Sequence, residues 1–276
     1  MRKTVVLTLF VGVSVLFGCT TRLAKLEKSA DFDELYKGAI AYYEQGKYGK
    51  AKLLFEKVSP YYRGTLEAEK VQFYWAYCEY YQKLYTLAAF RFKNFYQTYG
   101  RSEYAEQAEY MHAFSLYKDS PDSNLDQTSS EEAVIAMQNF LNRRPASQYY
   151  TRANEIIDEL QVRFETKAYE TAKLYYKLST GLSFRNYLEA AIVTFDSFKA
   201  DYPDSKYNEE LMYLSIETGY KLAENSITVR RKERFQKTIA YYNSFVERYP
   251  ESEYKAQALN YLEQSKKELE ALNKVD

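Results

Sequence analysis

The chain has few of the residues on which most catalytic and metal sites depend. Its 276 residues include one histidine, His112, and two cysteines, Cys19 and Cys78. A zinc site needs several such ligands, and a general base is most often a histidine. We interpret His112 as a structural histidine within a helix and Cys78 as a small apolar core residue. The sequence therefore predicts no enzyme activity, no metal and no cofactor.

Proline and glycine are also scarce, with five and nine residues respectively. No Asn-Gly or Asp-Gly turn of a β-hairpin occurs, and aromatic residues recur at intervals of three and four instead of two. These features predict an all-α chain.

Net charge is absent, because 38 basic side chains balance 38 acidic ones. A nucleic-acid-binding domain usually carries a clustered excess of Lys and Arg. We therefore expect no nucleic-acid partner.

What the chain does have is tyrosine, with 31 Tyr and 16 Phe against one Trp, and a short phrase that recurs five times. The phrase places a small residue, an aromatic, an apolar residue and a second aromatic at spacings of four, three and four, followed by Pro or Gly, then Ser and Tyr. Its fullest copy is Ala191, Phe195, Phe198, Tyr202, Pro203, Ser205 and Tyr207. The other copies begin at Ala51, Ala88, Ala133 and Thr238. Those spacings put four residues on one helical face, so the phrase predicts a packing seam that ends where the next helix begins, with Ser as its cap.

Together with the helix upstream of it, the first copy resembles the tetratricopeptide repeat. The matching residues are Ala39, Tyr42, Gly46, Tyr48, Ala51 and Phe55. The second repeat matches with Tyr80, Tyr81, Tyr85, Ala88 and Phe92, and its turn reads as one residue shorter. Repeated hairpins of this kind stack on one another and build a binding scaffold. We predict a tetratricopeptide-repeat superhelix of about five helix hairpins plus a C-terminal helix over residues 31–276.

The repeats are unequal in length. Successive small residues of the phrase lie 37, 45, 58 and 47 residues apart, against an ideal period of about 34. We expect the excess in polar interruptions at residues 118–130, 179–186 and 224–234. In the first of these, Ser129 and Glu132 are predicted to form a capping box for the following helix.

The amino terminus reads as an export signal. Arg2 and Lys3 precede an apolar run, Val5 to Phe17, that is shorter than the roughly 20 residues a membrane-spanning helix needs. The sequence Leu16, Phe17, Gly18, Cys19 resembles the bacterial lipobox. We expect a signal peptide over residues 1–18, lipidation at Cys19, and a tether over residues 19–30. The alternative is an ordinary cleaved signal with an incidental cysteine.

Doubled tyrosines supply the candidate binding residues. Two neighbouring tyrosines of a helix cannot face the same neighbour, and in the repeat family the second of such a pair tends toward the concave surface. We therefore single out Tyr43, Tyr81 and Tyr176, joined by Tyr36, as partner-binding or peptide-binding residues. A general compositional preference for tyrosine explains the same residues equally well.

A lipobox, a short tether and about five such hairpins together resemble the BamD family of β-barrel assembly lipoproteins, over Cys19 to about Leu272. The resemblance implies a lipid-anchored, periplasm-facing outer-membrane scaffold. It also implies three kinds of partner, namely the periplasmic domains of a BamA-like barrel subunit, other assembly-machinery lipoproteins, and nascent outer-membrane β-barrel proteins. Gly100 in place of Pro and the long spacing before Ala191 depart from the family pattern.

Two other classes of function stay open. One is a helical-repeat surface lipoprotein that binds glycan or peptide in a nutrient uptake system, although such chains are usually far longer. The other is an enzyme such as a cell-wall hydrolase, which would need a paired carboxylate pocket that the sequence does not display.

Overall fold

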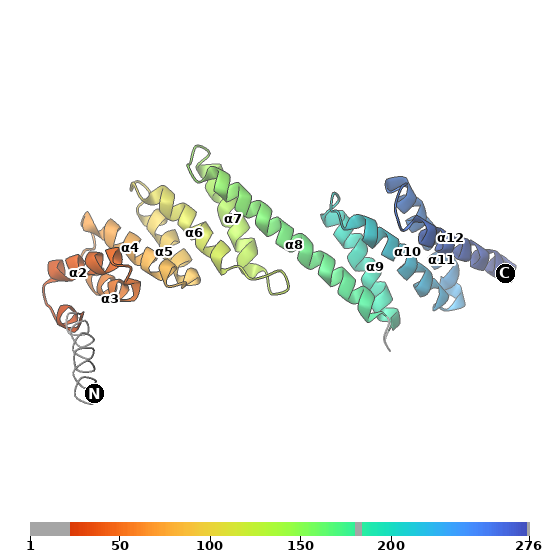
Figure 1. The fold of residues 1–276 in the computed structure, drawn as a ribbon, viewed down its shortest axis with the longest axis horizontal. Helices are drawn as coiled ribbons and strands as arrows, with labels where there is room; N and C mark the ends of the chain where they lie inside the picture. Colours follow the sequence, from red (N-terminus) through yellow and green to blue (C-terminus); the bar gives the residue numbers. More distant parts are fainter. Residues whose placement is uncertain (1–22, 180–183, 275–276) are drawn as a thin grey trace, which may run out of the picture. The chain divides into compact units, whose positions relative to one another are not determined.

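The computed structural model describes residues 23–179 and 184–274. The signal peptide, Cys19, the start of the tether, and Gly181 lie outside the described residues. Within them every regular element is a helix, which confirms the predicted all-α fold (Figure 1). The helices are α2 (Phe32–Glu44), α3 (Tyr48–Val58), α4 (Glu67–Tyr81), α5 (Tyr85–Thr98), α6 (Ala105–Asp119), α7 (Thr128–Arg143), α8 (Tyr150–Leu178), α9 (Phe184–Asp201), α10 (Asn208–Glu224), α11 (Thr228–Arg248) and α12 (Lys255–Asn273).

The helices form two compact units, one ending at Leu160 and the other beginning at Gln161. The first unit contains the hairpins α2/α3, α4/α5 and α6/α7 and the start of α8. The second contains the remainder of α8 with α9, the hairpin α10/α11, and α12. Among the described residues the predicted five hairpins and C-terminal helix are therefore all present.

The recurring phrase forms the packing seam that its spacing predicts. Its small residues Ala51, Ala88, Ala133 and Ala191 are all fully buried. Its aromatic residues supply most of the largest fully buried side chains. These are Phe55, Phe92, Phe95, Phe140, Phe195, Phe198 and Phe245. The seam is thus the main apolar core of both units, and its burial drives the helices together.

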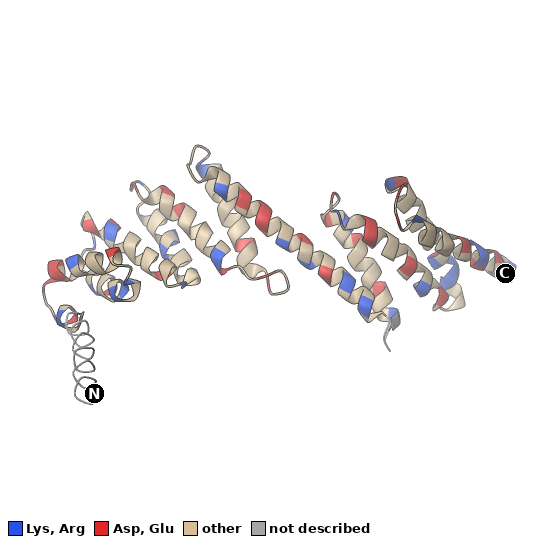
Figure 2. Ribbon diagram, viewed as in Figure 1, with Lys and Arg blue, Asp and Glu red and all other residues tan. Residues whose placement is uncertain are grey.

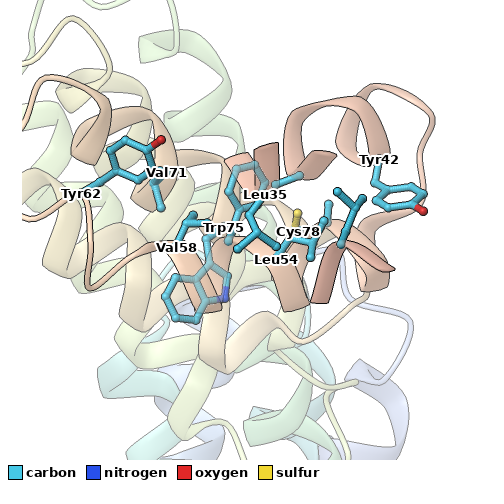
Figure 3. Packing of buried hydrophobic residues seen from close by; sticks show 12 residues of the cluster. Leu35, Tyr42, Leu54, Val58, Tyr62, Val71, Trp75 and Cys78 are labelled. Carbon is cyan, nitrogen blue, oxygen red and sulfur yellow. The ribbon is translucent and has the colours of Figure 1, made fainter. Parts of the chain in front are cut away.

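A cluster of buried residues from α2, α3 and α4 illustrates this packing (Figure 3). Leu35, Leu54 and Val58 are fully buried there, and the Cys78 side chain lies among them. Burial raises the pKa of the Cys78 thiol to about 12. Its interpretation as an apolar core residue is confirmed, because a buried and protonated thiol is a poor nucleophile.

The turns of the first two hairpins are equal in length, which corrects the one-residue difference expected from the sequence. Three residues separate the helices in each case. The N–H of Gly46 donates to Tyr43 O at 2.9 Å, and that of Lys83 donates to Tyr80 O at the same distance. Gly46 and Lys83 have φ values of 70° and 61°. Lys83 therefore occupies the left-handed position that glycine normally takes. Because the residue there is a lysine, the sequence did not reveal that the two turns match.

The serines of the phrase act in the turn and not at the helix terminus. Tyr104, Tyr207 and Tyr254 are the N-cap residues of α6, α10 and α12, and none makes a side-chain cap bond. Instead Ser205 Oγ accepts the N–H of Tyr207 at 3.1 Å, and Ser252 Oγ accepts that of Tyr254 at 3.2 Å. Each serine thus fixes the backbone of the turn two residues ahead.

The capping box predicted for α7 is wrong. The helix begins at Thr128, so Ser129 already lies within it, and its N-cap residue is Gln127. The amide of Gln127 is buried and donates to Asp122 O at 2.8 Å and to Leu125 O at 3.1 Å. These two bonds hold the loop that precedes α7, and they come from a glutamine instead of the serine that the capping-box pattern requires.

The long spacing between Ala133 and Ala191 arises from a helix more than from a polar insertion. Helix α8 runs for 29 residues, from Tyr150 to Leu178. Its first part packs in the first unit, where Ile156 and Leu160 are fully buried. Ala172, near its other end, belongs to a core cluster of the second unit. Helix α8 therefore contributes buried residues to both units. Its length of 29 residues explains much of the long spacing between Ala133 and Ala191.

Candidate partner-binding surface

In four copies of the phrase, the tyrosine at its end stacks on a ring from the first helix of the same hairpin. Tyr207 lies over Tyr169 with ring centroids 4.0 Å apart and an interplanar angle of 13°. Tyr149 lies over Tyr110 at 4.3 Å and 8°, and Tyr254 lies over Tyr213 at 4.7 Å and 10°. In the second repeat Tyr104 lies over Phe73 at 4.5 Å and 27°. Part of the tyrosine content is therefore explained by repeated stacking between successive repeats.

Polar contacts fix the same junctions. Tyr169 Oη donates to Glu210 Oε2 at 2.6 Å, and Lys173 also pairs with Glu210. Ser205 Oγ donates to Glu165 Oε1 at 2.5 Å, and Ser147 Oγ donates to Glu106 Oε1 at 2.6 Å. The repeats within each unit are thus held in register by ring stacking and by carboxylate contacts.

The structure brings Tyr43 and Tyr81 together. Their ring centroids are 6.4 Å apart, and two further tyrosines complete the group. Tyr48 stacks on Tyr81 at 4.4 Å, and Tyr74 lies 4.8 Å from Tyr43. We call Tyr43, Tyr48, Tyr74 and Tyr81 the tyrosine cluster. Sequence reasoning missed Tyr48 and Tyr74, because only the fold shows that they approach the predicted pair.

The tyrosine cluster is partly open to solvent. Tyr81 is 46% exposed and the other three members are half-buried. Burial raises the pKa of the Tyr43 and Tyr81 hydroxyls, so both are neutral at physiological pH. The cluster therefore offers ring faces and uncharged hydroxyl groups, which suits contact with a polypeptide that carries apolar side chains.

The other two predicted residues lie elsewhere. Tyr36 is two turns before Tyr43 on α2 and packs against Tyr62, with ring centroids 5.4 Å apart. Tyr176 belongs to the second unit, where the Lys221 ammonium lies 5.6 Å from its ring centroid. Burial and a hydrogen bond with Glu217 raise the pKa of Tyr176. Among the four predicted tyrosines, a ring contact within the described residues therefore joins Tyr43 to Tyr81.

Residues of α5, α6 and α7 line a cleft of about 490 Å³. No sequence motif predicted this cleft. Phe90 and Ile135 line the cleft, and these two residues are 62% and 58% exposed. His112 lines it and faces the Ala89 carbonyl, with Nδ1 3.0 Å from the oxygen. Since that oxygen can only accept, Nδ1 carries the proton in the neutral ring. The interpretation of His112 as a structural histidine is consistent with this bond.

Two features of the described residues bear on other functions. No group of three or more His, Cys, Asp or Glu side chains is placed there to hold a metal ion. None of the described helices combines the length and apolar character needed to cross a bilayer.

Stacked helical hairpins with exposed aromatic and apolar groups define the class of the protein as a helical-repeat protein. The model of the YfiO family, described as outer membrane lipoprotein, matches residues 28–181 and 184–273. The chain belongs to that family.

A relative in Aquifex aeolicus (strain VF5) is described as "Putative outer membrane protein assembly factor BamD". It is 25% identical to the chain over 186 residues. The match covers 65% of this chain and 60% of the relative, so the chain spans less than two thirds of the relative's length. Family membership and this relative support the resemblance to the BamD family and an association with the outer membrane.

Proposed function

We propose that the protein is a non-catalytic scaffold subunit of the machinery that assembles β-barrel proteins in the outer membrane. It is anchored by lipid at Cys19, faces the periplasm, and binds a BamA-like barrel subunit together with other assembly lipoproteins. The family and the named relative support this proposal. The structural observation that supports it most is the partly exposed tyrosine cluster of the first two repeats.

The tyrosine cluster suits an unfolded barrel substrate. A nascent barrel strand is extended and presents an apolar side chain at every second residue. Stacked tyrosine rings provide a broad apolar surface at low cost in side-chain entropy, and the hydroxyls can bond to the strand's backbone groups. Capture and release then depend on binding alone, with no chemical step.

Helix α12 is the proposed contact with the barrel subunit. Ala258, Leu262 and Ser265 are buried on the side that packs within the second unit. Leu259 is 42% exposed, so an apolar side chain remains available on another side of the helix. We assign the partner subunit to this exposed side of α12.

Site-specific photocrosslinking in cells tests substrate binding. A photoreactive residue at Lys83, beside the tyrosine cluster, is expected to crosslink to nascent outer-membrane barrel proteins. Tyr43→Ala with Tyr81→Ala should weaken that crosslinking several-fold. Tyr81→Phe should retain it, because the ring remains. Tyr150→Ala is the matched control, since Tyr150 is 41% exposed and lies outside the cluster. Unchanged crosslinking in the double variant, with the helical circular dichroism intact, would refute substrate capture at this site.

Affinity purification from solubilised outer membranes tests the partner subunit. The protein should copurify with a BamA-like barrel subunit, and Leu259→Glu should reduce the yield of that subunit. Val193→Glu is the control, because Val193 on α9 is 63% exposed. Recovery of a glycan transporter in place of the barrel subunit would contradict the proposal.

Mass spectrometry of the mature chain should find acyl chains on Cys19, and an unmodified thiol there would refute the lipid anchor.

A further inference from the structure

The first described residues are packed onto the repeats. Residues 23–27 are helical, and we call residues 23–28 the anchor segment. Leu26 is 7% exposed and Leu23 packs against the same core cluster of the first unit. Residues 23–28, which belong to the expected tether over residues 19–30, are therefore packed against the core of the first unit.

A glycine makes room for this packing. A Cβ atom at Gly38 on α2 would lie 2.9 Å from Leu26 Cδ1, closer than such contacts allow. Lys57 on α3 also donates a hydrogen bond from Nζ to the backbone oxygen of Glu27. The anchor segment is thus held against both α2 and α3.

This packing limits the distance between the repeats and the lipidation site. Four residue steps separate Cys19 from Leu23, and they span at most roughly 14 Å when fully extended. If acyl chains on Cys19 enter a bilayer, the anchor segment and the parts of α3 that touch it must lie close to the lipid headgroups. This step rests on the lipid anchor of the proposed function.

The anchor segment and α3 are together basic, although the whole chain is neutral and α2 carries more acidic than basic residues. Residues 23–28 and 48–58 contain five lysines, at positions 25, 28, 50, 52 and 57, against Glu27 and Glu56, which gives a net charge of +3. None of these lysines belongs to an ion pair among the described residues. The charge view shows blue segments on both the anchor segment and α3 (Figure 2).

One face of α3 combines charge with an apolar side chain. Lys50, Leu53 and Lys57 follow a spacing of three and four residues, so they share a helical face. Leu53 is 47% exposed. A basic face that includes an exposed apolar residue is typical of segments that lie on anionic membranes.

We propose that the anchor segment and the Lys50, Leu53, Lys57 face of α3 form a membrane-contact surface that binds anionic phospholipid headgroups. This second attachment, beside the acyl chains, fixes the orientation of the first repeat on the bilayer. A lipid anchor combined with a basic surface holds a protein on a membrane more stably than one acyl chain alone.

Vesicle cosedimentation tests the surface without the lipid anchor. A chain that starts at Thr20 keeps every contact described above, because those contacts begin at Leu23. It should bind vesicles of equal parts phosphatidylglycerol and phosphatidylcholine, and only weakly those of phosphatidylcholine alone. High salt should release it, because the interaction between exposed charges is screened. Removal of each lysine should lower binding about fivefold.

Charge reversal provides the matched comparison. Lys25→Glu, Lys28→Glu and Lys50→Glu together should reduce binding at least a hundredfold, given about fivefold per lysine. Lys199→Glu, Lys206→Glu and Lys266→Glu make the same charge change at exposed positions of the second unit and should leave most binding intact. Equal loss in the two triple variants, or equal binding to both vesicle types, would overturn the proposal. Neither result would affect the lipidation measurement at Cys19.

A proximity measurement tests the orientation in the lipidated chain. A fluorophore on Leu53→Cys should be quenched by lipids that carry a quencher in the headgroup, and one on Ile135→Cys of α7 should be quenched less. Gly38→Val should displace Leu26 and reduce quenching at position 53, while the acyl chains keep the protein on the vesicle. Equal quenching at positions 53 and 135, or no effect of Gly38→Val, would show that the first repeat is not held against the bilayer.

Discussion

Tyr207 lies flat on Tyr169, with ring centroids 4.0 Å apart, across the junction between α8 and α10. The two residues are 38 positions apart in the sequence, and each is also tied to its surroundings by hydrogen bonds. The same stack recurs at three other junctions. Ring stacking between successive repeats is therefore a general element of this scaffold.

Removal of the ring at this junction should destabilise the second unit. Tyr207→Ala is expected to lower the free energy of unfolding by about 2 kcal/mol, because the stack and its buried area are lost. Tyr207→Phe should change it by less than about 0.5 kcal/mol, since the ring remains. Tyr169→Phe should cost about 1 kcal/mol through the lost bond to Glu210. Hydrogen exchange of α8 and α10 amides measures these effects locally, and equal protection in all three variants would contradict them.

The turn at Lys83 offers a stabilising substitution. Lys83 adopts φ 61°, in the left-handed region that disfavours residues with a Cβ atom. Lys83→Gly should therefore raise the stability of the α4/α5 hairpin by about 0.5 to 1 kcal/mol. Gly46→Lys makes the reverse change at the equivalent position and should lower stability by a similar amount. Chemical denaturation monitored by Trp75 fluorescence would measure the stability of both variants. A destabilised Lys83→Gly variant would show that the backbone of Lys83 is not strained.

The helical repeat was predictable from the sequence because its seam follows a strict spacing. Burial of Ala51, Ala88, Ala133 and Ala191 follows directly from that spacing. The second turn was misjudged because Lys83 gives no sign that its backbone is left-handed. The tyrosine cluster was predicted only in part, since the approach of Tyr74 to Tyr43 depends on how two hairpins stack.

The packing of the anchor segment against α2 and α3 also could not be predicted from the sequence. Two leucines in six residues do not define a helical period, and the space at Gly38 exists only after α2 and α3 have packed. The cleft around His112 is similar, because three helices supply its walls. Features that arise from tertiary packing leave weak local signals, whereas the repeat leaves a strong one.

A buried ion pair in α4 and α5 predicts a large effect of a single substitution. Glu79 is 1% exposed, and Arg91 Nε donates to its Oε2 at 2.6 Å. The Arg91 guanidinium also lies 3.4 Å from the Trp75 ring centroid. Arg91→Ala should lower the free energy of unfolding by about 3 kcal/mol, because a buried carboxylate loses its partner. Glu79→Gln added to Arg91→Ala should recover part of that loss, and Trp75 fluorescence during urea denaturation would report both.

Arg91→Lys separates charge from stacking in the same pair. Lysine keeps a positive charge near Glu79 but lacks the planar group that covers Trp75. An intermediate loss of stability is expected, together with a change in Trp75 emission. A stability equal to that of the original chain would show that the stack on Trp75 contributes little.

Protonation of His112 should destabilise the first unit at acidic pH. Burial is the main cause that lowers the pKa of His112 from its usual 6.5 to about 4; the bond to Ala89 opposes this shift, and the nearby Lys93 and Arg143 add to it. The unfolded chain therefore binds a proton between about pH 6.5 and 4 that the folded chain does not. Stability from this residue is complete above pH 6.5 and falls as the pH drops toward 4, by up to about 3 kcal/mol. His112→Gln lacks this titration, so its stability should depend less on pH across that window. Because the chain has one histidine, the difference between the two denaturation profiles isolates His112, and parallel profiles would show that its ring is protonated equally in both states.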